Sequence, residues 1–320
     1  MADKKKYPSG PGLWNAQSIQ TPKGVLVTGV LLRKPANPLP PQGSWWSTLK
    51  KTIRTYFLKP YKGAFYLSID GEKHEVQTDS HGGFEACVET TSPNDLKFLE
   101  RDGETPISLL HSYPHEFDFS KARYMVISDI DDTILVSKSA LFFSKLWLML
   151  FRQTAKRNFV EETEQAYRKL LQSNVSFAYV SASEYNLFSI ISNFVTFHEL
   201  PLGPILLRPM QRWKNVVKSK DRQTYKIDRI EQLIEQFPET RFVLFGDDSQ
   251  HDPQVFGQII ERHPKNIHAV YLRKTGFISD EKSSAKLEQI SKEVDVYSYA
   301  QFSEIEPPIN TLIDEITAGA

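Results

Sequence analysis

The chain has 320 residues, 40% of them hydrophobic and 24% charged, and its 39 basic and 39 acidic residues give a formal net charge of +0. These values are typical of a globular protein of about two domains and give no indication of a nucleic-acid partner. The single cysteine, Cys87, excludes an internal disulfide and a cysteine-rich zinc site. The polar N-terminus has no apolar core of a secretory signal, and the longest apolar run, Leu141 to Phe151, is shorter than the ~20 residues that span a bilayer. We therefore expect a cytoplasmic protein.

Residues 1–22 are rich in Lys, Pro, Gly and Ser, which predicts a flexible tail. From residue 23 to residue 121 the pattern is β-rich, with runs that we expect to form strands at 24–34, 63–69, 72–78, 84–89 and 107–111. The dipeptide Asp70-Gly71 between two of these runs is a strong signal for a two-residue hairpin. We predict a small antiparallel β-sandwich domain over 23–121. Its histidines have no metal-ligand spacing and are interpreted as surface or turn residues; they are His74, His81, His111 and His115.

One helix is expected inside this domain, over residues 44–58, because its apolar residues recur at three- and four-residue spacing. Its basic residues lie off that apolar face. Two interpretations stay open. The helix closes one end of the β domain, or it lies on a membrane surface.

After residue 122 strands and helices alternate, which is typical of a parallel sheet with helical crossovers. The expected strands are 124–128, 175–180, 204–208, 241–246 and 267–272. The expected helices are 160–172, 184–196, 225–237, 253–262 and 281–294. The sequence therefore predicts an α/β domain with a Rossmann-like parallel sheet over 122–320.

Three carboxylates follow the first strand of this domain within four residues: Asp129, Asp131 and Asp132. Burying unpaired charge costs several kcal/mol or more, so packing does not explain carboxylates at the end of an apolar strand. Side chains alternate along an extended chain, so Asp129 and Asp131 start on the same side. One of them can attack a substrate while the other transfers protons.

Four polar clusters follow strands or begin helices, and a parallel sheet would bring them together at its carboxyl edge. They are Asp129, Asp131 and Thr133; Ser181, just after a strand; Lys226, at the start of a helix; and Asp247, Asp248 and Asp252, after the run Phe242–Phe245. Solvated or supporting roles remain the alternative for Asp132 and Asp248.

This set of residues favours phosphoryl transfer through a phospho-aspartate. An anionic nucleophile and a phosphate dianion repel each other, so the site needs a divalent cation and a fixed positive charge. Mg²⁺ prefers oxygen ligands, and Asp129 and Asp247 fit that role. The main-chain carbonyl of Asp131 would supply a further oxygen. Asp252 would bind the metal directly or hold a metal-bound water.

The remaining roles follow from the same chemistry. The Lys226 ammonium would neutralise charge on Asp129 and on the phosphoryl group. The Ser181 hydroxyl would bind a phosphoryl oxygen. The Asp131 carboxyl would donate a proton to the leaving alkoxide and then accept one from the water that hydrolyses the intermediate.

These clusters resemble the haloacid-dehalogenase superfamily, and within it the actin-patch-protein type of phosphatidate phosphatase catalytic domain. The resemblance covers residues 122–276. The motifs that carry it are Ser-Asp-Ile-Asp-Asp-Thr at 128–133, Val-Ser-Ala-Ser at 180–183, Leu-Arg-Pro at 207–209, Tyr-Lys-Ile-Asp at 225–228, Gly-Asp-Asp-Ser-Gln-His-Asp-Pro at 246–253 and Arg-Lys at 273–274. It implies Mg²⁺-dependent hydrolysis of phosphatidate to diacylglycerol, with a β-rich domain in front of the catalytic domain.

The resemblance also bears on substrate binding. It assigns Thr133, Ser183, Arg208 and Arg273 to the substrate, although each arginine could equally form a structural ion pair. It implies a cap over the site, which we place at 136–172. The stretch Ser139–Arg152 is strongly apolar, and it either reaches into a lipid surface, giving peripheral membrane contact, or packs onto the β domain.

Two functions stay open beside the lipid phosphatase. The chain could hydrolyse a soluble or protein phosphomonoester instead, or it could be a membrane or protein adaptor whose activity has decayed. The complete set of aspartates argues against the adaptor.

Overall fold

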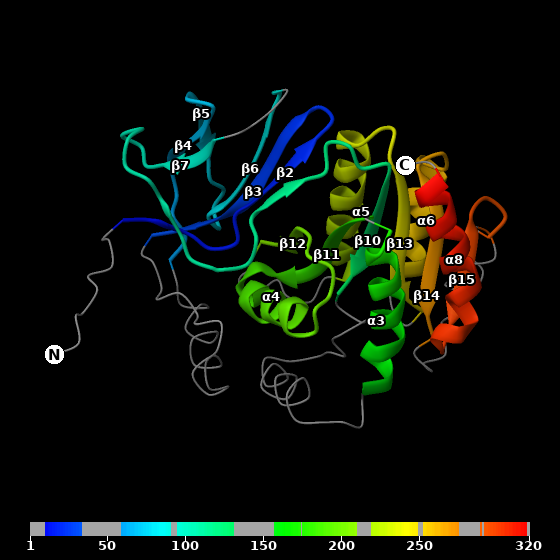
Figure 1. Ribbon diagram of the computed structural model, residues 1–320. Helices are drawn as coiled ribbons and strands as arrows, with labels where there is room; N and C mark the ends of the chain where they lie inside the picture. Colours follow the sequence, from blue (N-terminus) through cyan, green and yellow to red (C-terminus); the bar gives the residue numbers. More distant parts are fainter. Residues whose placement is uncertain are drawn as a thin grey trace. The chain divides into compact units, whose positions relative to one another are not determined.

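The computed structural model describes residues 10–33, 59–90, 95–130, 157–173, 175–209, 219–248, 252–274, 289 and 291–318. Within these ranges the fold is mixed α/β, with one parallel sheet and further sheets that are mainly antiparallel. The described residues divide into two compact units. The first holds residues up to Ser120 and the segment Glu184–Phe194, and the second holds the rest of the chain from Lys121, apart from Pro209. The elements of each unit are labelled in Figure 1.

The described residues of the first unit form nine strands. They are β1 (Gly12–Leu13), β2 (Gln17–Thr21), β3 (Gly24–Leu32), β4 (Ala64–Ile69), β5 (Glu72–Gln77), β6 (Gly83–Val88), β7 (Leu96–Leu99), β8 (Ser108–Leu109) and β9 (Glu116–Asp118). One sheet has the order β8-β1-β3-β2-β9, with β6 also paired to β3, and a second has the order β5-β4-β7. Pairs β1·β8 and β2·β9 are parallel, which the sequence analysis did not predict.

Apolar side chains from both sheets share one core, so the two sheets pack face to face. Among them are Val25, Val27, Leu31, Phe65, Leu67, Phe84 and Phe98. The hairpin predicted at Asp70-Gly71 is confirmed: β4 and β5 pair as Ile69↔Glu72, and both turn residues have positive φ, 52° and 88°.

The expectation of a flexible tail over residues 1–22 is wrong for its second half. β1 and β2 both pair with β3, and Trp14 between them is buried. These strands could not be predicted from composition, because the segment is largely polar. They are stabilised by backbone pairing with β3 and not by an apolar run of their own. The helix expected at 44–58 lies outside the described residues.

Trp14 and His111 hold the segment Glu184–Phe194 within the first unit. The Trp14 indole N–H donates a hydrogen bond of 2.8 Å to the buried carbonyl of Tyr185. The His111 ring meets the Phe188 ring edge-on, with 4.7 Å between centroids. His111 is therefore partly buried and packed, which corrects its interpretation as a surface or turn residue.

Among its described residues, the second unit contains a six-stranded sheet in the order β12-β11-β10-β13-β14-β15. Its strands are β10 (Tyr124–Asp129), β11 (Ser176–Glu184), β12 (Ile205–Arg208), β13 (Arg241–Asp247), β14 (Ile267–Arg273) and β15 (Asp295–Tyr299). Every strand pair from β11 to β15 is parallel. β15 was not predicted from the sequence.

Helices cover both faces of this sheet. They are α3 (Arg157–Leu171), α5 (Ser219–Gln236), α6 (Asp252–Arg262) and α8 (Phe302–Ala318). The short 3₁₀ helix η2 (Tyr185–Leu187) and most of α4 (Phe188–Phe197), which follows it, belong to the first unit. α3 packs beside α8 and α5 packs beside α6, on opposite faces of the sheet (Figure 1). No helix among the described residues is both long and apolar enough to cross a bilayer.

Replacing Trp14 tests how the segment Glu184–Phe194 is held. Trp14→Phe keeps an aromatic ring but leaves the Tyr185 carbonyl buried without its donor, which costs roughly 1–3 kcal/mol. We expect a lower urea midpoint by circular dichroism. Thr105→Val deletes a solvent-exposed hydrogen bond to Asp102 and should change stability by less than about 0.5 kcal/mol. Equal midpoints for both variants would contradict the role given to Trp14.

His111 makes stability depend on pH. Burial, followed by repulsion from His115, lowers the pKa of His111 to about 4, from about 6.5 in an unfolded chain. Between these two pKa values the unfolded state binds a proton that the folded state does not. The free energy of unfolding is therefore at its full value above about pH 6.5 and decreases as the pH falls toward about 4.

The measurement is unfolding free energy at pH 7 and pH 5 for the wild type and for His111→Phe. Over this range the wild type should lose on the order of 1 kcal/mol more than the variant. If the wild type and the variant lost the same free energy of unfolding, the pKa of His111 would not be lowered in the folded protein.

Candidate active site

The site lies at the carboxyl edge of the parallel sheet. Asp129 is the last residue of β10 and Asp247 is the last residue of β13, and these two strands are neighbours with Ser128 paired to Phe245. Along the chain, β10, β11 and β12 extend the sheet in one direction, and β13, β14 and β15 extend it in the other. The strand order reverses between β10 and β13, which is where open α/β sheets bind ligands.

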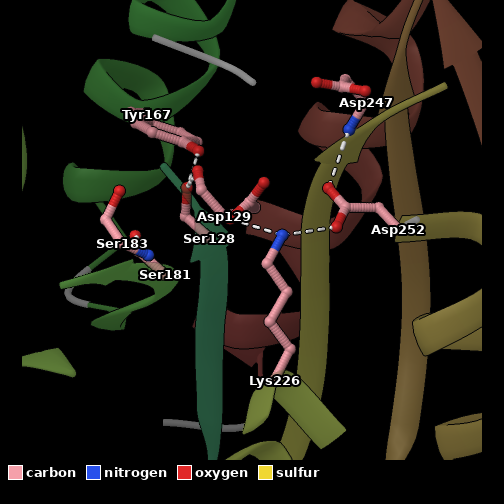
Figure 2. Close-up of polar contacts among 8 residues, drawn as sticks. All are labelled: Ser128, Asp129, Tyr167, Ser181, Ser183, Lys226, Asp247 and Asp252. Carbon is pink, nitrogen blue, oxygen red and sulfur yellow. Dashed lines mark hydrogen bonds and ion pairs between the residues drawn. The ribbon is translucent and has the colours of Figure 1, made fainter. Parts of the chain in front are cut away.

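Lys226 joins two of the predicted clusters. Its Nζ lies 2.8 Å from Asp129 Oδ1 and 2.8 Å from Asp252 Oδ1, and all three side chains are buried. Figure 2 shows the lysine extending from α5 to a position between the two carboxylates. An ammonium group removed from water requires this kind of compensation, so the lysine and the two aspartates form one electrostatic unit.

The position of Lys226 corrects the sequence analysis in one respect. α5 begins at Ser219, so the lysine lies about two turns into the helix and not at its start. The apolar periodicity begins only at residue 227, and the polar residues before it gave no signal, although they are compatible with a helix.

Asp252 connects the lysine to the end of β13. It is the first residue of α6, and its Oδ2 accepts a 3.2 Å hydrogen bond from the backbone N–H of Asp247. Burial raises the pKa of Asp252, the Lys226 ammonium opposes this shift, and the nearby Asp247 carboxylate adds to it. Gly246 is required here, because a Cβ at this position would collide with the Asp252 carboxylate and the Phe256 ring.

Ser181 and Ser183 lie on the other neighbour of β10. β11 continues to Glu184, so both serines are inside the strand, whereas the sequence analysis placed Ser181 just after it. Asp129 pairs with Val180, which puts Ser181 beside the end of β10. Ser181 is fully buried, and its Oγ accepts a 2.9 Å hydrogen bond from the Ser183 backbone N–H.

The two predicted substrate arginines also end strands. Arg208 is the last residue of β12 and is buried, and Arg273 is the last residue of β14, paired in register with Asp247. The carbonyl of Arg273 accepts a hydrogen bond of 3.0 Å from the Asp248 N–H. The structure therefore places both arginines at the carboxyl edge, and their predicted contact with substrate stays a prediction.

The structure adds two hydroxyl groups that the sequence analysis did not single out. The Tyr167 hydroxyl lies 2.5 Å from Ser128 Oγ, and Ser128 Oγ donates a 2.9 Å hydrogen bond to the carbonyl of Asp129. No local signal could have identified Tyr167, because it lies 39 residues from Ser128 on a different element. Ser128 directly precedes Asp129, but its sequence context does not indicate a partner.

Several predicted residues lie outside the described ranges: Asp131, Asp132, Thr133 and most of the cap predicted at 136–172, including Ser139–Arg152. Within the part of the chain that the structure describes, no group of three or more His, Cys, Asp or Glu side chains forms a metal site. The strand-end carboxylates of Asp129 and Asp247 nevertheless fit Mg²⁺, which uses one or two carboxylates together with substrate oxygens and water.

Two comparisons with known proteins match the region of the chain that contains this site. The family model of the phosphatidate phosphatase APP1 catalytic domain matches residues 124–274. Phosphatidate phosphatase APP1 of Saccharomyces cerevisiae is 27% identical over 206 residues, which are 61% of this chain and 34% of that protein. The chain thus spans about a third of the length of this relative.

Solved structures give only weak similarity. An acetyl xylan esterase from the rumen bacterium Butyrivibrio proteoclasticus is 9% identical, with 98% of this chain and 97% of that chain covered, at a TM-score of 0.25. A ferredoxin-NADP⁺ reductase from Plasmodium falciparum is 10% identical, with 91% and 96% covered, at a TM-score of 0.20. TM-scores this low carry no argument about fold or function.

The matched region begins at the first residue of β10 and ends one residue after β14. It contains the buried ion pairs of Lys226, Ser181 and Ser183 of β11, and both strand-end arginines. Over residues 124–274 the chain is similar to the catalytic domain of phosphatidate phosphatase APP1, and this similarity covers the strands and helices that carry the site.

Proposed function

We propose that this protein is a Mg²⁺-dependent phosphatidate phosphatase that produces diacylglycerol at a membrane surface through an aspartyl-phosphate intermediate. The observation that carries the proposal is the buried Lys226 ammonium, 2.8 Å from Asp129 and from Asp252, beside Asp247 at the carboxyl edge of the sheet. The family match supports the substrate class. The central position of β10 in the parallel sheet supports a Rossmann-like fold of the haloacid-dehalogenase type.

Asp129 is the proposed nucleophile. Its carboxylate attacks the phosphorus atom, the phosphorus–oxygen bond to the glycerol breaks, and water later hydrolyses the aspartyl phosphate. The Asp131 carboxyl donates the proton to the leaving alkoxide and then takes one from the attacking water. The ion pair with Lys226 favours the charged form of Asp129 and so keeps it competent for attack.

The other residues bind and orient the phosphoryl group. The Lys226 ammonium and the Ser181 hydroxyl bind its oxygens, and Ser183, Thr133, Arg208 and Arg273 contribute further donors. Asp129 and Asp247 would hold Mg²⁺, with the Asp131 carbonyl as another oxygen and Asp252 supporting the metal directly or through water. When bound, the metal supplies positive charge that reduces the repulsion between nucleophile and phosphate.

A panel of substrates tests the activity. Phosphate release is measured with Mg²⁺ for phosphatidate in mixed micelles, phosphatidate in vesicles, glycerol 3-phosphate and a phosphoserine peptide. We expect kcat/KM for the lipid phosphate to exceed that for the soluble esters by about tenfold or more, because binding of the acyl chains contributes to transition-state stabilisation. Chelation with EDTA should abolish the activity.

Two variants control this panel. Asp129→Asn should lower phosphate release by about 10³-fold or more, because the amide is not a nucleophile. Asp314→Asn changes an exposed carboxylate on α8 and should behave as wild type. A preference for soluble esters would replace the lipid with a soluble or protein phosphomonoester, and no release from any substrate would favour the adaptor.

A further inference from the structure

Tyr167 occupies a buried position under the carboxyl end of β10. It lies on α3, its side chain is 3% exposed, and its ring meets Phe177 of β11 at 5.4 Å and Phe245 of β13 at 5.2 Å, both edge-on. These two rings come from the strands on either side of β10. The position of the Tyr167 hydroxyl is therefore fixed by packing against both neighbours of the strand that carries Asp129.

The hydroxyl begins a short chain of hydrogen bonds that ends on the backbone of Asp129. Ser128 Oγ donates to the Asp129 carbonyl at 2.9 Å, so its proton is used there. The 2.5 Å contact between Tyr167 and Ser128 must then have the tyrosine as donor. Burial, followed by repulsion from Tyr299, raises the pKa of Tyr167 well above its usual range, so the proton needed for this bond is present.

The hydrogen bonds from Tyr167 through Ser128 reach Asp129 from one face of the sheet, and Lys226 contacts Asp129 from the other face. Adjacent side chains of a strand point to opposite faces, so Ser128 points toward α3 whereas Asp129 points toward α5. Figure 2 shows Tyr167 and Lys226 on opposite sides of the end of β10. One contact therefore holds the backbone carbonyl of Asp129, and the other holds its carboxylate.

We propose that Tyr167, through Ser128, is a positioning residue for the Asp129 carboxylate. The inference rests on the proposed function, in which Asp129 attacks the phosphoryl group. A carbonyl fixed at the end of β10 limits rotation of the Asp129 backbone, and this limits the directions that its carboxylate can take. In-line attack needs such a fixed direction, and a displacement of about 1 Å can cost about 10²-fold in rate.

Tyr167→Phe tests the proposal, because it removes one oxygen and keeps the ring contacts with Phe177 and Phe245. We expect kcat to fall by about 10- to 100-fold while KM changes by less than about threefold, since orientation acts mainly in the transition state. Ser128→Ala should have a similar effect. The double variant should be no worse than the more damaging single variant, because both belong to one chain of hydrogen bonds.

Tyr179→Phe is the matched control. It deletes the buried hydroxyl of a tyrosine on β11, which donates a 2.8 Å hydrogen bond to the carbonyl of Pro201. It should lower the urea midpoint about as much as Tyr167→Phe and leave kcat within about twofold of wild type. Equal losses of kcat in the two variants would reduce Tyr167 to a structural role and overturn the proposal.

A second readout does not depend on activity. In metal-free protein, the ¹³C resonance of the Asp129 carboxylate should move in Tyr167→Phe and in Ser128→Ala but stay in place in Tyr179→Phe. If it stays in place in all three variants, Tyr167 does not position Asp129. If the resonance moves as expected and no phosphomonoester is hydrolysed, the proposed function fails while the positioning role is retained.

Discussion

The contact of one lysine with two aspartates determines how the carboxyl edge of the parallel sheet is assembled. Lys226, Asp129 and Asp252 come from α5, β10 and α6, and each is almost completely removed from solvent. A single buried charge would cost several kcal/mol, so each of these residues depends on the others for its ionised state. The same contact brings together segments 97 and 26 residues apart in the chain, and it can form only when the parallel sheet and both helices are in place.

Other features of the edge follow from this contact. Asp252 can reach Lys226 only where α6 begins close to the end of β13, and this approach requires a glycine at position 246. On the opposite face, the Asp129 backbone is held by hydroxyl groups from β10 and α3. Contacts thus reach Asp129 from two sides, at its carboxylate and at its backbone carbonyl, and in the proposed mechanism they supply the preorganisation that electrostatic catalysis requires.

Much of this arrangement could be predicted from the sequence, because a short apolar run followed directly by polar residues marks the end of a buried strand. The apolar run Tyr124–Ile127 is followed at once by Asp129, and Phe242–Phe245 is followed by Asp247, so both carboxylates were expected at one edge. The Asp70-Gly71 hairpin was predicted for a similar reason, since its turn chemistry is local. Roles that depend on Asp131 or Thr133 stay predictions, because those residues lie outside the described part of the chain.

What could not be predicted depends on contacts between distant or polar segments. β1 and β2 have no long apolar run, and only pairing with β3 makes them strands. α5 begins with residues that carry no apolar periodicity, so its start was placed too late. Tyr167 lies within the helix expected at 160–172, but no local pattern marks its hydroxyl, because the partner of that hydroxyl is on another element.

A double-mutant cycle between Lys226 and Asp252 tests the central claim most directly. Unfolding free energies are measured in metal-free protein for Lys226→Met, Asp252→Asn and the double variant. Lys226→Met leaves two buried carboxylates without their ammonium partner and should cost about 3–5 kcal/mol, whereas Asp252→Asn leaves Lys226 paired with Asp129 alone and should cost less. The double variant should cost at least about 1 kcal/mol less than the sum of the two single variants. Single-variant costs that add to within about 0.5 kcal/mol would show that the lysine and the aspartate do not interact, and would contradict the account.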